Sequence, residues 1–236
     1  MSETLLEISG LSKDYQTLRP LRIKSLTVNR GDVIAISGID VPGAETFAHL
    51  VTGATLPDAG DVLLFGRNTR HITDGEAWLR SLDGVGMITA RGILVEMFSV
   101  LQNIALSLTL DVDPIDPRLL PQAGALAREV GIDPVQFDLP AGRVAPDVQM
   151  RVHLARALAL EPHLLIAEHP SASLPRDSVA GFGADLGKVA RGRGLALLAI
   201  TADDSVAKAI GGSRLELVPA TGELRALSRI RRLFGQ

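Results

Sequence analysis

Short apolar runs, separated by turns and by helical stretches, dominate the pattern of hydrophobic and polar positions. The run Val33-Ile34-Ala35-Ile36 has the length and β-branched content of a buried strand. Further strands are expected at residues 5–8, 26–28, 62–65, 163–167 and 195–200. Helices are expected at residues 46–51, 76–82, 100–110, 121–130, 146–160 and 180–190. Strands that alternate with helices predict an α/β domain with a mainly parallel sheet.

Composition narrows the class of protein. The 236 residues are 46% hydrophobic, 22% charged and only 3% aromatic, which excludes a disordered chain and favours an aliphatic core. A net charge of −3 gives no overall basic field, so we expect no nucleic-acid partner. The chain has no cysteine, which excludes disulfides and thiolate chemistry but leaves the redox compartment undetermined. Because neither a signal peptide nor a membrane span is recognisable, we expect a cytoplasmic protein.

The stretch after the first buried strand has the glycine spacing of a phosphate-binding loop. Gly38 and Gly43 match the template G-x-x-x-x-G-K-[ST], but Ala44 and Glu45 stand at the lysine and hydroxyl positions. Two like charges about 4 Å apart repel by about 4 kcal/mol at an effective dielectric of about 20, so Glu45 opposes phosphate. Pro42 also removes a backbone N–H from the loop. Since a helix N-terminus stabilises a carboxylate, Glu45 is expected to occupy the anion site itself.

The remaining sequence resembles the ATP-binding subunits of ABC transporters. Residues 151–170 match, without a gap, the family's helix that runs from the signature motif into the Walker B strand, and residues 171–174 continue into the D-loop. Segments 11–15, 56–60, 64–67 and 98–106 match in the same order, and the first of them carries the A-loop aromatic residue at Tyr15. The resemblance covers nearly the whole chain, to about residue 224.

The resemblance implies a fold as well as a family. It implies a P-loop NTPase-like (RecA-like) α/β core with a mainly parallel sheet and N-terminal antiparallel strands, formed by residues 1–84 and 151–224. Residues 85–150 are expected to form an α-helical subdomain, and residues 225–236 a C-terminal tail. Leucine and isoleucine at helical spacing among arginines predict a solvated terminal helix for this tail.

The positions that perform chemistry in the family carry other residues here. The resemblance places the Q-loop glutamine at Ala90, the magnesium-linked aspartate of Walker B at Glu168, the catalytic glutamate at His169 and the switch histidine at Ala202. The signature motif falls on residues 144–148 and the D-loop aspartate on a proline, at position 175. The signature segment therefore lacks the hydroxyl and a backbone N–H that grip phosphate in the family.

Several of these residues also have a structural interpretation. Tyr15 fits adenine stacking and simple packing equally well. Glu168 is expected to pair with a neighbour or to be protonated rather than to hold Mg²⁺, and His169 is expected to be structural, because a base without a positioned phosphate and water does nothing. Thr46 offers a substitute hydroxyl near the loop. We assign no catalytic residue and no metal ligand, and ATP with Mg²⁺ is the cofactor only if one binds.

Three functions remain open on this basis. The leading hypothesis is a pseudo-ATPase, an ABC-type subunit with a structural or regulatory role in a membrane transport complex. The alternatives are an atypical subunit that still hydrolyses ATP, and a stand-alone binding module on the same scaffold. By resemblance, a transmembrane subunit would dock near residues 90–98, on the inner face of the membrane. The oligomeric state stays open, with a homodimer and a heterodimer with another ATP-binding subunit as the two dimers that the resemblance suggests.

Overall fold

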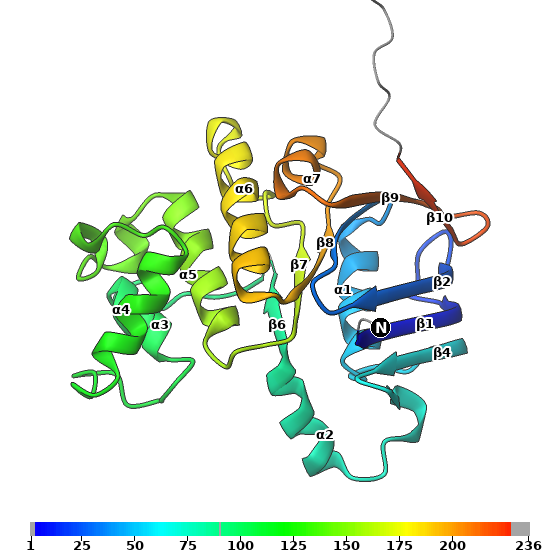
Figure 1. Ribbon diagram of the computed structural model, residues 1–236, viewed down its shortest axis with the longest axis horizontal. Coiled ribbons are helices and arrows are strands. Elements are labelled where there is room, and N and C mark those ends of the chain that lie inside the picture. Colours follow the sequence, from blue (N-terminus) through cyan, green and yellow to red (C-terminus); the bar gives the residue numbers. More distant parts are fainter. Residues whose placement is uncertain (1–2, 90, 228–236) are drawn as a thin grey trace, which may run out of the picture.

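The computed structural model describes residues 3–89 and 91–227 and contains two β-sheets within those ranges (Figure 1). The first has four strands in the order β2-β1-β4-β5: Leu21–Asn29, Thr4–Lys13, Ala59–Leu64 and Arg67–Asn68. The second has six in the order β10-β9-β3-β8-β7-β6: Glu223–Ala226, Ser213–Val218, Val33–Ser37, Ala196–Ile200, Leu164–Glu168 and Val85–Ile88. The described helices are α1 Val41–Val51, α2 Gly75–Ser81, α3 Val100–Ala105, α4 Leu120–Glu129, α5 Pro146–Leu158, α6 Arg176–Arg193 and α7 Asp204–Ile210.

The second sheet is parallel from β9 through β6, and only β10 runs antiparallel. Every residue of β7 and of β8 is buried, because the sheet is covered on both faces. Register places Ile36 and Glu168 on either side of Ile200. The loop after β3 and the end of β7 therefore meet at the carboxyl edge of the sheet.

Alternate residues of the central strands belong to two separate hydrophobic clusters. Leu164 and Ile166 of β7 pack with the first sheet and α1, whereas Leu165 and Ala167 pack with α3, α4, α5 and α6. In Figure 1 the helices α3, α4 and α5 gather at one end of the molecule and the first sheet at the other. None of the helices in the described part of the chain has the length and apolar character needed to cross a membrane.

The α/β class, the mainly parallel sheet and the antiparallel N-terminal strands are confirmed. Three helices differ in extent from their predictions. The helix expected at 180–190 runs from Arg176 to Arg193, and the helix expected at 46–51 already begins at Val41. The helix expected at 100–110 ends at Ala105. There the Ala105 carbonyl accepts the N–H groups of Leu108 and Thr109, which closes the helix with tight turns.

The helix predicted for residues 225–236 can be compared with the structure only at residues 225–227. Arg225, the first residue of the predicted tail, lies in strand β10 rather than in a helix, and residues 228–236 lie outside the described residues. The division of the chain into residues 1–84, 85–150 and 151–224 stays a prediction.

Phe47 should be one of the most costly core positions to truncate. Its ring is fully buried between α1 and the strands around it, and Phe→Ala substitutions in cores lose about 3–5 kcal/mol. Urea unfolding of Phe47→Ala should show a loss of this size, whereas Val135→Ala, at a side chain that is 76% exposed, should change little. Equal effects of the two substitutions would contradict this packing.

Candidate functional site

The N-terminus of α1 is capped by a side chain from within the loop. Asp40 is the N-cap residue: its Oδ1 accepts the Gly43 N–H at 2.8 Å, and its backbone carbonyl accepts the Ala44 N–H at 2.9 Å. The helix start expected at residue 46 is therefore wrong, because aspartate is a favoured N-cap and Pro42 in the first turn costs no hydrogen bond.

Capping changes what the glycine loop can bind. A phosphate cradle needs backbone N–H groups that point at the ligand, yet those of Gly43 and Ala44 are satisfied by Asp40. Asp40, rather than Glu45 as expected, thus places its carboxylate at the helix N-terminus. Ala44 is fully buried, and the Thr46 hydroxyl donates to the Pro42 carbonyl at 2.8 Å, so it is used inside the helix.

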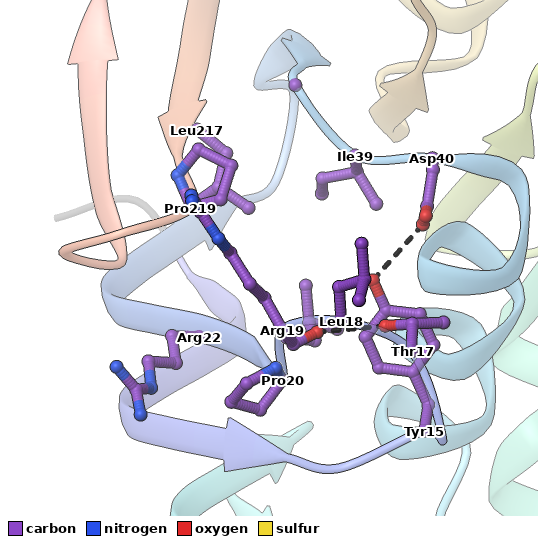
Figure 2. Close-up of a pocket in the computed structure, with 12 residues that line it drawn as sticks. Tyr15, Thr17, Leu18, Arg19, Pro20, Arg22, Ile39, Asp40, Leu217 and Pro219 are labelled. Atoms are coloured by element: carbon purple, nitrogen blue, oxygen red, sulfur yellow. Dashed lines mark hydrogen bonds between the residues drawn. The ribbon is translucent and has the colours of Figure 1, made fainter.

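Tyr15 belongs to the same cluster. The half-buried Tyr15 donates its hydroxyl to Asp40 Oδ1 at 3.2 Å, which ties the segment after β1 to the start of α1 (Figure 2). One carboxylate oxygen thus holds both the tyrosine and the helix.

An arginine lies between the two acidic positions of the site. The Arg91 guanidinium forms an ion pair with Glu45 through one terminal nitrogen and with Glu168 Oε2 at 3.6 Å through the other. Glu45 comes from α1 and Glu168 from the end of β7, so Arg91 bridges the loop after β3 and the edge of the sheet. The Glu168 side chain is only 8% exposed, and among the described residues its Oε1 has no hydrogen-bond partner.

Burial governs the protonation of Glu168. Loss of hydration raises the pKa of this carboxyl to about 7; the Arg91 charge opposes the rise and the Glu45 charge adds to it. Glu168 therefore both pairs with a cation and exchanges a proton near neutral pH.

The remaining positions that match family motifs are His169, Ala202, Ala90 and the signature segment. His169 has a backbone φ of +42° and donates its N–H to the Ile200 carbonyl at 2.7 Å, and within the described residues its buried Nε2 has no partner. Ala202 is exposed where β8 ends, and Ala90 lies outside the described residues. At the signature position, α5 begins at Pro146 after Ala145, an N-cap residue whose side chain makes no capping bond.

Sequence reasoning missed two residues of this site. Asp40 had a local signal, since aspartate two residues before a proline is a typical helix start. Arg91 had none, because its partners are distant in the sequence and only the folded sheet brings them together.

The residues present do not fit a magnesium nucleotide held in the way of the P-loop template. The template lysine is absent, the N–H groups of Gly43 and Ala44 bind Asp40, and a guanidinium lies between the carboxylates of Glu45 and Glu168. Such a ligand would require both Asp40 and Arg91 to move.

Comparison with solved structures defines the class. The chain has the fold of ATP-binding cassettes in the P-loop NTPase class. A dimeric cassette bound to ADP and phosphate after hydrolysis superimposes with a TM-score of 0.75 and 19% identity, over 94% of this chain and 97% of that one. A nucleotide-free cassette gives a TM-score of 0.72 over 94% of this chain and 89% of that one, at 18% identity.

Sequence comparison defines the family: the chain belongs to the ABC transporter family, whose profile matches residues 21–172. The lipoprotein-releasing system ATP-binding protein LolD 2 of Caulobacter vibrioides is 33% identical, over 88% of this chain and 92% of that protein. The methionine import ATP-binding protein MetN of Mesorhizobium japonicum is 30% identical, over 89% of this chain and 56% of that protein.

The buried Glu168 should leave a signature in the dependence of stability on pH. Its folded-state pKa of about 7 exceeds the ordinary value of 4.5, so the folded chain binds more protons between these values. The contribution of Glu168 to the free energy of unfolding therefore decreases as pH rises from 4.5 through 7. Glu168→Gln carries no such proton, and its stability relative to the native chain should rise between pH 5 and 8 by on the order of 2 kcal/mol.

Urea unfolding at several pH values measures this difference. Glu76→Gln, at a carboxylate that is 84% exposed, serves as the matched control for the change from Glu to Gln. A constant difference for Glu168→Gln would contradict the assignment.

Proposed function

We propose that this chain is a pseudo-ATPase, a subunit of an ABC-type transport complex that contributes structure or regulation without hydrolysing ATP. The observation that carries the proposal is the Arg91 guanidinium between Glu45 and Glu168. By family resemblance these two positions correspond to the P-loop hydroxyl and the Walker B carboxylate on the Mg²⁺ side of the nucleotide. A tethered protein cation therefore stands where a magnesium ion would be needed.

Electrostatics supports this proposal. A magnesium nucleotide would have to displace Arg91, and Glu45 would then face the phosphates without a neutralising charge. Unpaired charges in a partly buried site are costly, and no lysine is present at position 44 to offset them. Asp40 adds a second carboxylate at the end of α1, where phosphate would otherwise find N–H donors.

The signature segment, which forms the other half of a shared site in the family, also carries residues that disfavour phosphate. The family resemblance implies a site formed by the Walker motifs of one subunit and the signature motif of another. Here the signature position offers Ala145 without a hydroxyl, Pro146 without an N–H and the carboxylate of Asp147. A dimer with a competent ATP-binding subunit would therefore hold one altered half in each shared site.

A groove beside the arginine supports a transmembrane partner. A cavity of about 300 Å³ is lined by residues that include Gly92, Ile93, His153 and Arg156, and the Arg156 guanidinium donates to the Ile93 carbonyl at 2.8 Å. Ile93 is 81% exposed, and Met97, four residues further along the chain, is 89% exposed. These apolar side chains suit a segment of a membrane subunit, which would place the chain on the inner face of the membrane.

Calorimetric titration with Mg-ATP tests the pseudo-ATPase. We expect no binding by the native chain, which corresponds to a Kd weaker than about 1 mM, and no phosphate release. The variant Asp40→Gly/Ala44→Lys/Glu45→Ser restores the template residues and should gain binding, provided that circular dichroism shows a folded chain. Micromolar binding or steady hydrolysis by the native chain would overturn the proposal and favour the atypical ATPase.

Sedimentation with membranes tests the groove. In its own cells the native chain should sediment with the membrane fraction, and Ile93→Glu/Met97→Glu should move most of it to the supernatant, because charge opposes burial of this surface. The matched control is Leu79→Glu, at an exposed leucine on α2, and it should sediment like the native chain. An unchanged distribution for the double variant would argue against this docking surface.

A further inference from the structure

A separate cavity lies between the turn that follows β5 and the helix α2. Its volume is about 300 Å³, at the lower end of the range of small-molecule pockets. In Figure 1, α2 lies at the lower edge of the molecule, next to the start of β6. The cavity has an apolar wall, formed by Ile72, Ala77 and Trp78, and a polar side that includes Arg67, His71 and Asp74.

The apolar wall of this cavity is fixed by packing. Trp78 is 7% exposed, and its indole N–H donates to the Thr52 carbonyl at 2.9 Å. Gly53, with a φ of +69°, lies against the same wall, because a Cβ there would come within 2.9 Å of Ile72 Cδ1 and 3.1 Å of Trp78 Cζ2. A ligand would therefore meet a preformed apolar surface.

Of the two arginines in the turn after β4, only one is used by the fold. The Arg70 guanidinium donates to the carbonyls of Pro57 and Gly60, which ties the turn to the start of β4. Arg67 lines the cavity and is exposed, and its guanidinium has no hydrogen bond or ion pair with any residue in the described ranges. Because a guanidinium is always charged and presents its donors as a planar fork, Arg67 suits a carboxylate.

A carboxylate lines the same cavity. Asp74 is the N-cap residue of α2, and its Oδ1 accepts the Ala77 N–H at 2.9 Å. Within the described part of the chain, its Oδ2 accepts no hydrogen bond, and no ion pair joins Asp74 to Arg67 or to His71. Opposite charges that border one cavity without pairing are complementary to a ligand that carries both signs of charge.

We propose that this cavity binds a free α-amino acid with an apolar side chain. The carboxylate of the ligand pairs with Arg67, its ammonium group pairs with Asp74, and its side chain lies against Ile72 and Trp78. A simple anion would leave the Asp74 carboxylate without a cation, and a simple amine would leave Arg67 without an anion. The inference goes beyond the proposed function, because none of these residues belongs to the site around Arg91.

The single tryptophan of the sequence gives a local signal for the test, since that residue is Trp78. Titration with L-leucine at pH 7 should change its fluorescence, and calorimetry should show one site with a Kd below about 1 mM. Two analogues separate the charges: N-acetyl-L-leucine lacks the ammonium group and L-leucinamide lacks the carboxylate. Each should bind about tenfold more weakly than leucine, because each loses one charged pair.

Two variants assign the charged pairs to residues. Arg67→Gln should weaken leucine and N-acetyl-leucine by about tenfold and leave leucinamide unchanged. Asp74→Asn should weaken leucine and leucinamide and leave N-acetyl-leucine unchanged, and asparagine retains the cap of α2. The matched controls, which should bind all three compounds like the native chain, are Arg176→Gln, at an exposed arginine outside the cavity, and Asp133→Asn, at an exposed aspartate that caps another turn.

The contrary results are equally specific. No binding of leucine by the native chain, or binding that leaves the fluorescence of Trp78 unchanged, overturns the inference. Equal losses in Arg67→Gln and Arg176→Gln, or in Asp74→Asn and Asp133→Asn, also overturn it. These results leave the pseudo-ATPase standing, because that proposal depends on Mg-ATP and on the residues around Arg91. Losses that follow the charge of the compound, as described above, support the amino-acid site.

Discussion

The ion pairs of Arg91 with Glu45 and Glu168 are the interaction on which the character of this site depends. Two carboxylates that face one compact space repel each other, and burial of one of them increases the cost. A cation between them removes the conflict. Magnesium could serve that purpose, but a guanidinium supplied by the same chain needs no ligand and is always charged. The charges of Glu45 and Glu168 are thereby paired within the chain.

The fold explains why these three residues meet. Parallel strands bring the loop after β3 and the end of β7 to one edge, with β8 between them. The segment that follows β6 then carries Arg91 to the same edge, since β6 pairs with β7. The scaffold of an ATP-binding cassette is thus retained, while Arg91 pairs with the two carboxylates of Glu45 and Glu168.

The sequence predicted the scaffold more fully than the site. Continuous aliphatic runs at β3, β7 and β8 are recognisable because strands covered on both faces contain almost no polar residues. The start of α1 was misplaced, because the glycine template suggested a loop where Asp40 and Pro42 already signal a helix. The role of Arg91 could not be predicted from the sequence, because an ion pair between distant segments leaves no periodicity or spacing in the chain.

A crystal structure of the native chain grown with Mn²⁺ and ATP, with an anomalous difference map, tests the central claim most directly. We expect guanidinium density between Glu45 and Glu168 and no manganese peak at that place. A manganese peak bonded to either carboxylate, with Arg91 turned away and nucleotide phosphates beside α1, would contradict the assignment of Arg91 to this position.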